Sequence, residues 1–405
     1  MRLAVLAFFV LALAAPVAAT GDLASGDKVA GTVLAIESSR GQDYLVRVDR
    51  ESLRPVSKRV AVGGHAYAWS FSPDGRRLAL GVDRVKGVRI FDVRRVKPLG
   101  QLRTWSGGIS TIAWLGPRRL LGWEPAGLFM LDPIARRRLA SPQASGDVVS
   151  ALRAGSRLAL LMAPIQEIGP AQLAVVGVDG AVRTVPLGRI RAGMRPEGDG
   201  MGQSYRPALV YDMDGRVFVL GAGGDPMAEV DVARLAVTYH EPKHSQTLLT
   251  RFRNWIEPAA AAKLPLTGSF RDALWLGEGK IAFWGYESIS VGTDRVEMKQ
   301  IGLSVVDTND WTIKTIDGSA WGARFGGSTL LAWYQHGGLN GYSLDGAQRY
   351  HLFGGDALGV VATYGSRAFV AFDHKPLHVI DAATGEVLGT RRGLPRLLDS
   401  GFSGW

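Results

Sequence analysis

The chain has 405 residues, of which 46% are hydrophobic and 21% are charged, as in an ordinary globular protein. It contains no cysteine, which excludes disulfide bonds, zinc–thiolate sites and thiol nucleophiles. The formal net charge of +10 is compatible with a negatively charged partner, such as an anionic polymer of the cell envelope, but arginines scattered on surface loops explain it more simply.

Residues 1–19 have the pattern of a secretory signal peptide. Arg2 gives a positive start, an apolar run follows, and Val17-Ala18-Ala19 places small residues before the cleavage point. We therefore expect cleavage before Thr20 and an extracytoplasmic protein, either secreted or held in the cell envelope. The mature chain, residues 20–405, is expected to be a monomer that does not span a membrane, because no later run reaches about eighteen apolar residues.

A pattern of apolar residues followed by aspartate recurs along the chain, about 47 residues apart on average. The aspartates are Asp49, Asp92, Asp132, Asp179, Asp231, Asp307, Asp345 and Asp381. A period of about 40 to 50 residues with four short strands is typical of a β-propeller blade. Each aspartate would end the third strand of its blade and accept a backbone N–H to hold the next turn.

The second unit shows the four strands most clearly. They are expected at residues 68–72, 77–82, 87–93 and 97–102, and the Pro73-Asp74-Gly75 turn separates the first two. Other units contain a dense apolar second strand, which indicates a strand covered on both faces. Counting the hairpins of second and third strands predicts an all-β propeller of eight four-stranded blades, with seven as the alternative.

Three segments depart from the repeat. The first unit lacks a first strand, and residues 394–401 are expected to supply it and close the ring. An insertion at about 241–267 has helical spacing of apolar residues, and Leu248, Phe252 and Trp255 on it are candidates for partner binding. Residues 191–204 are expected to form a Gly-rich connection.

Two stretches carry a resemblance to known families. WSFSPDGRRLAL, residues 69–80, resembles the blades of WD-repeat and TolB-like propellers. LHVIDAATGEVLGT, residues 377–390, is similar to YVTN-type and quinoprotein-like blades. The resemblance implies a β-propeller of the secreted bacterial type; these motifs specify blade turns and leave the function open.

Aromatic residues near the ends of second strands could form a platform for a sugar, a peptide or a lipid. The candidate ligand-binding residues are Trp123, Trp284, Tyr286, Trp333, Tyr334 and His336. Acidic residues on the loops between second and third strands could instead converge on a divalent cation such as calcium. These candidates are Glu37, Asp83, Glu124, Glu287 and Asp373.

The sequence thus favours a non-catalytic binding scaffold for a protein, a wall polymer or a small ligand. No cofactor is expected under this reading, and no specific nucleic acid. The alternative is a metal-dependent hydrolase, because propeller lactonases resemble the acidic arrangement and use a divalent ion to activate water.

Overall fold

The computed structural model describes thirteen longer segments of the chain, the single residue 52 and the pair 396–397. They are residues 32–39, 41–49, 52, 54–84, 87–103, 111–124, 127–142, 144–196, 203–244, 266–291, 295–334, 337–355, 358–372, 376–391 and 396–397. These residues contain strands and turns but no helix. No helix in this part of the chain could therefore cross a bilayer.

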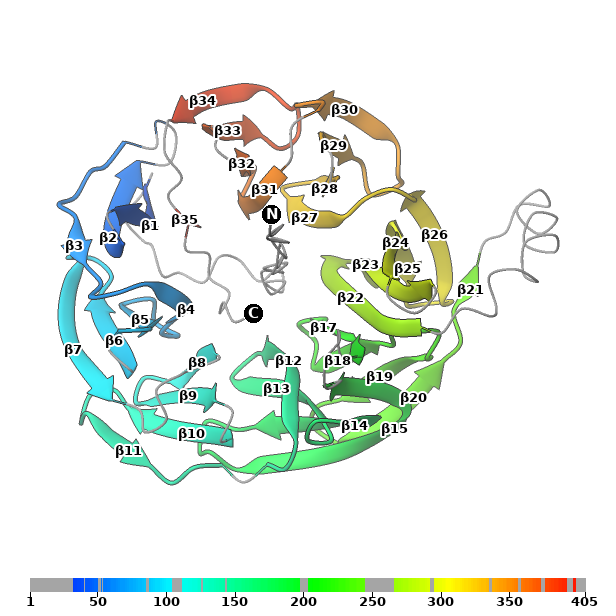
Figure 1. The fold of residues 1–405 in the computed structure, drawn as a ribbon, viewed down its shortest axis with the longest axis horizontal. Helices are drawn as coiled ribbons and strands as arrows, with labels where there is room; N and C mark the ends of the chain where they lie inside the picture. Colours follow the sequence, from blue (N-terminus) through cyan, green and yellow to red (C-terminus); the bar gives the residue numbers. More distant parts are fainter. Residues whose placement is uncertain are drawn as a thin grey trace, which may run out of the picture.

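The strands form sheets that are arranged around a ring (Figure 1). Neighbouring strands of a sheet are antiparallel, and in the described residues six sheets have four strands each. In five of them the first strand in chain order lies nearest the middle of the ring and the last lies outermost (Figure 1). This is the β-propeller architecture that the repeat predicts.

The bounds of the strands follow the expected units closely. Three four-stranded sheets contain the strands of about the first third of the chain, and the first of them also contains the C-terminal β35. They are β35 (Arg396–Leu397), β1 (Thr32–Ser39), β2 (Gln42–Asp49) and β3 (Val60–Ala61); β4 (Ala66–Phe71), β5 (Arg77–Val82), β6 (Gly87–Asp92) and β7 (Lys97–Arg103); and β8 (Thr111–Gly116), β9 (Arg119–Glu124), β10 (Gly127–Asp132) and β11 (Arg137–Leu139). Three more come from later in the chain: β17 (Ala208–Tyr211), β18 (Arg216–Leu220), β19 (Met227–Asp231) and β20 (Ala236–His240); β27 (Gly322–Gly326), β28 (Thr329–Trp333), β29 (Leu339–Tyr342) and β30 (Gln348–Leu352); and β31 (Leu358–Tyr364), β32 (Arg367–Phe372), β33 (Leu377–Asp381) and β34 (Val387–Arg391).

The remaining strands form one sheet of eleven strands. Its path is β12 (Asp147–Ala154), β13 (Arg157–Ala163), β14 (Ile168–Val176), β15 (Val182–Arg195), β16 (Gln203–Arg206), β22 (Leu266–Gly277), β23 (Lys280–Val291), β25 (Leu303–Asp307), β26 (Thr312–Asp317) and β21 (Lys243–His244), with β24 (Arg295–Gln300) paired to β23.

The prediction of eight, or alternatively seven, separate four-stranded blades is therefore wrong. Six sheets have the four-stranded form, and the other strands belong to one continuous sheet. The physical cause lies at residues 191–204, which were expected to be a connection. There β15 extends to Arg195 and pairs with β16, and β16 pairs in parallel with β22, so that backbone hydrogen bonds run on into the next set of strands.

The predicted helical insertion at about 241–267 is not seen. Its first residues include the short strand β21, which pairs in parallel with β26, and its last two residues begin β22. Residues 245–265 lie outside the described residues, and with them Leu248, Phe252 and Trp255.

The prediction for the end of the chain is confirmed. Strand β35 pairs antiparallel with β1, with Leu397 opposite Ala35 and Arg396 opposite Ile36. The C-terminal strand thus completes the sheet of the first unit, and the ring closes between the two ends of the chain (Figure 1). An open array would instead leave a row of unpaired backbone groups at the edge of β1.

The hydrophobic core is divided into clusters between neighbouring sets of strands. Phe91 and Leu80 of one sheet pack with Ile36 and Leu45 of the sheet before it. Burying one such side chain contributes roughly 1.5–3 kcal/mol, so each cluster ties two neighbours together. Because every sheet is covered on both faces, strands such as β5 are buried almost continuously, as the dense apolar runs predicted.

Candidate functional site

Three neighbouring strands of the eleven-stranded sheet, β16, β22 and β23, bring charged and aromatic side chains together. Arg206 of β16 lies opposite Phe270 of β22, and Phe270 lies opposite Tyr286 of β23. Directly opposed residues of neighbouring strands point to the same face of a sheet, so the three side chains form a row. Trp321, which immediately precedes β27 of the adjoining sheet, meets the end of this row.

The row is a continuous stack. The Arg206 guanidinium carbon lies 5.2 Å from the centroid of the Phe270 ring, within the range of a cation–π interaction. The Phe270 and Tyr286 centroids are 5.3 Å apart with an interplanar angle of 17°. The Tyr286 and Trp321 centroids are 5.6 Å apart with an angle of 9°. Phe270, Tyr286 and Trp321 are all partly exposed, so the stack is not part of the sealed core.

A carboxyl group lies beside this stack. Asp272 is two residues beyond Phe270 on β22 and therefore on the same face of the sheet. Arg206 and Arg324, the latter on β27, both act on it electrostatically. Loss of contact with water raises the pKa of Asp272 to about 7, even though Arg324 and Arg206 oppose the rise. Near neutral pH this carboxyl group is thus divided between its charged and neutral forms.

Both arginines are held against aromatic rings. Burial lowers the pKa of the Arg206 guanidinium, while Asp272 and Tyr286 oppose that change. The Arg324 guanidinium lies 5.7 Å from the centroid of the Trp333 ring. We refer to these partly exposed residues together as the arginine–aromatic cluster. Its members are Arg206, Phe270, Asp272, Tyr286, Trp321, Arg324 and Trp333.

A close contact explains why glycine occurs at position 322, the start of β27. A Cβ atom there would lie 2.2 Å from Cζ2 of Trp333, far inside van der Waals contact. The Trp333 indole therefore lies flat over the backbone of β27. The backbone N–H of Trp321 also donates to the carbonyl oxygen of Trp333 at 2.7 Å, which joins the two tryptophans through the main chain.

A hydrogen-bonded network adjoins the cluster in the chain, since Tyr334 follows Trp333 and Asp317 ends the strand before Trp321. The Tyr342 hydroxyl donates to Oδ2 of Asp317 at 2.6 Å, and the Tyr334 hydroxyl donates to the same oxygen. The Asn340 amide donates to the Tyr342 hydroxyl at 2.9 Å, and Nδ1 of His351 lies 2.6 Å from the Asn340 oxygen. Burial and the bond to Asp317 raise the pKa of Tyr334, which stays neutral. The network connects the loop before Trp321 to the residue after Trp333.

The candidate ligand-binding aromatics fall into three groups. Tyr286 and Trp333 belong to the arginine–aromatic cluster, and Tyr334 belongs to the network behind it. Trp123 and Trp284 are each only 3% exposed and pack in the core. His336 lies outside the described residues.

The candidate metal ligands do not share one place in the described residues. Glu37 is paired with Arg59 at 2.7 Å, and Glu287 with Arg271 at 2.8 Å. Asp83 accepts the backbone N–H of His65 at 2.7 Å. Glu124 ends β9, its side chain lies outside the described part, and so does Asp373. Within the described residues, no three His, Asp or Glu side chains are grouped to hold a metal ion.

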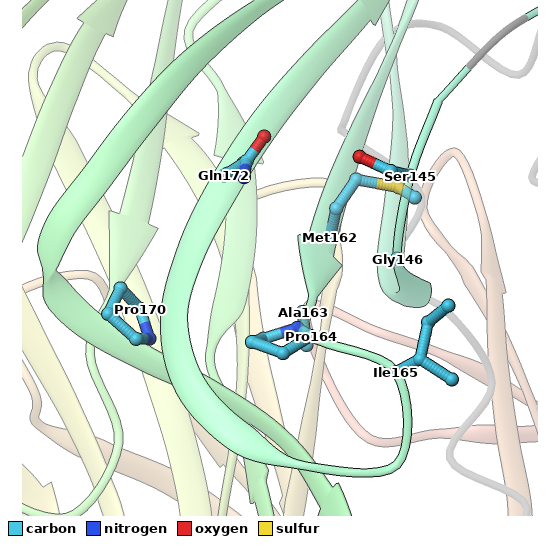
Figure 2. Close-up of a pocket in the computed structure, with 8 residues that line it drawn as sticks. All are labelled: Ser145, Gly146, Met162, Ala163, Pro164, Ile165, Pro170 and Gln172. Carbon is cyan, nitrogen blue, oxygen red and sulfur yellow. The ribbon is translucent and has the colours of Figure 1, made fainter.

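A cavity lies elsewhere, at the start of the eleven-stranded sheet (Figure 2). It has a volume of about 230 Å³ and is lined by Ser145, Gly146, Met162, Ala163, Pro164, Ile165, Pro170 and Gln172. Neither the candidate residues from the sequence nor the cluster residues line it. Ile165, at its edge, is 67% exposed.

Sequence reasoning did not find Arg206, Asp272, Trp321 or Arg324. A signal was present for Arg324, which is the one charged residue of the short strand β27. Nothing in the sequence shows that β16 lies beside β22, since their pairing joins segments that are about 60 residues apart. The position of Arg206 could therefore not be predicted.

Comparison with known proteins identifies the fold. No protein-family model and no curated protein matches the chain. Among solved structures, the dihydro-heme d1 dehydrogenase NirN in complex with DHE matches with a TM-score of 0.58 and 14% identity, over 96% of this chain and 77% of that one. AztD of Citrobacter koseri matches with a TM-score of 0.53 and 13% identity, over 92% and 98%. Sqt1 of Saccharomyces cerevisiae matches with a TM-score of 0.52 and 10% identity, over 81% and 85%. At these identities the likeness concerns the fold alone, and the chain is a β-propeller protein.

Proposed function

We propose that the protein is an extracytoplasmic binding protein, not an enzyme, and that the arginine–aromatic cluster is its contact surface for a negatively charged ligand. The single observation that supports this most is the stack of Arg206, Phe270, Tyr286 and Trp321 beside Asp272 and Arg324. Partly exposed aromatic rings and arginines are the residue types enriched where proteins recognise partners.

The charge of the site favours an anion. Two guanidinium groups face one carboxyl group whose pKa of about 7 leaves it partly neutral. A guanidinium presents a planar fork of donors that matches a carboxylate or a phosphate. The net charge of +10 acts in the same direction over a longer range, because it attracts anionic partners to the surface.

The ring provides a rigid support for such a surface. The cluster residues lie on strands or next to them, and the network of Asp317, Tyr334 and Tyr342 fixes the loop before Trp321. A preorganised site loses little conformational entropy on binding. One structural neighbour was solved with a bound molecule, DHE, although its likeness to this chain extends only to the fold.

The first prediction tests this function with variants of the cluster. Arg206→Ala and Trp321→Ala should each weaken binding of the ligand about tenfold or more, since a charge-assisted hydrogen bond or an aromatic anchor contributes about 1.5–3 kcal/mol. Binding would be measured by biolayer interferometry against a library of cell-envelope fragments and small anions, after native mass spectrometry of the purified mature protein for a ligand that copurifies.

Arg153→Ala is the matched control, because Arg153 is also a partly exposed arginine, on the inner strand β12. It should bind as the wild type does. Equal losses in Arg153→Ala and Arg206→Ala would argue against the cluster as the contact surface. Chemical conversion of the bound ligand, or a divalent ion at one equivalent in elemental analysis, would argue for the hydrolase instead.

A further inference from the structure

A strongly charged surface lies at one end of two sheets that are neighbours in the ring, β4–β7 and β8–β11 (Figure 1). Each sheet has two turns at this end, between its first and second strands and between its third and fourth strands. In the first sheet, for example, Arg77 pairs with Asp92 and Asp92 pairs with Lys97. With the strand residues beside them, the four turns are residues 71–77, 92–97, 116–119 and 132–137. They contain nine arginine or lysine residues and three aspartates, and we refer to them as the basic arc.

The turns of the two sheets lie on the same side of the ring and contact each other. The Arg77 guanidinium donates to the carbonyl oxygen of Pro117 at 3.4 Å, and the Arg136 guanidinium donates to the carbonyl oxygen of Leu99 at 2.6 Å. A guanidinium has five N–H donors, so each arginine keeps its charge and further donors for a partner. These bonds hold cations of adjacent sheets in fixed, neighbouring positions.

The three aspartates of the basic arc leave most of its positive charge in place. Asp74 and Asp92 accept backbone N–H groups of their own turns. Asp132 is only 4% exposed and pairs with Arg118 at 3.0 Å. The acids are thus used to hold the turns, and the surface keeps a large excess of cations.

The corresponding turns of two other sheets show that this excess is local. In the sheets β27–β30 and β31–β34 these turns are residues 326–329, 342–348, 364–367 and 381–387. They contain one arginine and three acidic residues. An arginine-rich composition would distribute cations over the turns of every sheet, so composition alone does not account for the basic arc.

Exposed apolar side chains lie among the cations. Ile134, in the last turn of the basic arc, is 47% exposed. Val178, in the turn between β14 and β15 of the next sheet, is also 47% exposed. That turn lies beside the arc, because a Cβ atom at Gly180 would be 3.8 Å from Nη1 of Arg119. Cations that surround apolar turn residues match a lipid surface, which has charged headgroups above an apolar layer.

We propose that the basic arc is a docking surface for a membrane that contains anionic phospholipids. Its cations bind the phosphates of the headgroups, and Ile134 and Val178 enter the layer just below them. The inference goes beyond the proposed function, because no residue of the arginine–aromatic cluster belongs to the basic arc. The protein would lie on the membrane surface, to which its net charge of +10 also attracts it.

The second prediction concerns binding to vesicles. The purified protein should sediment with phosphatidylcholine vesicles in which about one third of the lipid is phosphatidylglycerol, and it should stay in solution with phosphatidylcholine alone. Binding to the anionic vesicles should weaken steeply between about 50 mM and 500 mM salt, because salt screens the attraction. Equal binding to both kinds of vesicle, or no binding to the anionic ones, would overturn the inference.

A triple variant tests the position of the surface. Arg94→Gln/Arg95→Gln/Arg137→Gln removes three exposed cations of the basic arc. One cation near an anionic lipid surface contributes about fivefold in affinity, so the partition coefficient onto anionic vesicles should fall about a hundredfold. Circular dichroism and thermal melting would show that the variant folds as the wild type does.

The matched control is Arg195→Gln/Lys299→Gln/Arg349→Gln. It removes the same charge from three exposed positions outside the basic arc. Its partition coefficient should fall by less than about threefold, because only long-range attraction is lost. Equal losses in the two triple variants would show that net charge alone causes binding, and would overturn the inference.

A double variant separates a lipid surface from a soluble anionic polymer. Ile134→Ser/Val178→Ser should weaken binding to anionic vesicles about tenfold, since less apolar surface is buried, and should leave binding of soluble dextran sulfate unchanged. If dextran sulfate binds tightly and the double variant binds vesicles as the wild type does, the arc serves a soluble polymer and the inference fails. Arg206→Ala should bind vesicles normally, so failure of this inference and failure of the proposed function can be told apart.

Discussion

At the scale of single residues, the repeated aspartates hold the turns of the sheets. Seven of the eight accept a backbone N–H from a residue two or three positions on: Asp49, Asp92, Asp132, Asp179, Asp231, Asp307 and Asp381. For Asp345, the Ser343 hydroxyl donates to the carboxylate, and a backbone hydrogen bond from Ala347 also lowers its pKa. The prediction that these residues have a structural role is confirmed for the seven, and the reason is local: a short acceptor side chain reaches the N–H groups of the turn that follows it.

The third prediction concerns Asp132, the most enclosed of these turns. Burial acts to raise its pKa, but the N–H groups of Ala135 and Ile134 and the Arg118 guanidinium lower it below the usual value. Asp132→Ala removes bonds of 2.9 Å to both N–H groups and an ion pair of 3.0 Å with Arg118. The free energy of unfolding at pH 7, measured with urea, should fall by about 1–3 kcal/mol.

The sign of the pH effect follows from the lowered pKa of Asp132. Its stabilisation is present above the pKa of the unfolded chain, about 3.9, and is lost as the pH falls through the lower pKa of the folded state. The difference between Asp132→Ala and the wild type should therefore shrink below about pH 4. Asp179→Ala, which loses a single N–H bond of 3.1 Å, is the control and should cost less at pH 7. Equal costs would show that burial and Arg118 contribute nothing.

At the scale of elements, strand length decides where a sheet ends. Strand β15 has 14 residues, and its inward residues Leu187, Ile190 and Ala192 are fully buried. The glycines in this region suggested a loop, but β15 pairs with β14 up to Gly193, and its residues 193–195 pair with residues 203–205 of β16. Apolar spacing was therefore the better guide than glycine content, because burial of one face outweighs the modest cost of glycine in a strand.

The fourth prediction concerns the short strand β35. A chain that ends at residue 393 loses the pairing of β35 with β1 and exposes the edge of that sheet. We expect a lower melting temperature and concentration-dependent association, measured by circular dichroism and light scattering. A chain that ends at residue 397 retains β35 and should behave as the full-length protein does. Identical melting of all three chains would show that β35 does not stabilise the ring.

At the scale of the whole molecule, stability is distributed around the ring. The core cluster that contains Val33 and Val46 also contains Phe369 and Val379, so the first and last described units pack on each other. A hydrogen bond also joins two neighbouring sheets, since the indole N–H of Trp114 on β8 donates to the carbonyl oxygen of Ser70 on β4 at 3.0 Å. A ring of this kind has no terminal unit that must be capped.

The fifth prediction concerns the mature chain. Residues 1–19 should be removed during export, because their charge and apolar run fit a signal peptide. N-terminal sequencing of the protein recovered from the envelope or medium of a bacterial host should begin at Thr20. Replacing three residues of the apolar run with charged ones should keep the protein in the cytoplasm with an intact N-terminus. Recovery of an intact N-terminus outside the cytoplasm would contradict the prediction.

Part of the candidate site was predictable and part was not. Tyr286 and Trp333 were identified because aromatic residues at strand ends stand out in a repeat. Trp284 satisfied the same criterion, yet it is only 3% exposed, because it packs in a core cluster with residues such as Leu274 and Leu330. An aromatic residue near a strand end can be recognised in the sequence, but its burial cannot, because burial depends on how neighbouring sheets pack. Asp272 could not be identified as titrating near neutral pH from its sequence neighbours.

The sequence by itself determined that this protein is an all-β repeat, that aspartate turns recur along it, and that its C-terminal strand returns to the first unit. These features depend on residues close together in the chain or on the alternation of apolar and polar residues, and both can be read from one sequence. The tertiary structure alone decided how many strands join one sheet and which charges meet. Pairing of β16 with β22, and the approach of Arg206 and Arg324 to Asp272, depend on contacts between distant segments.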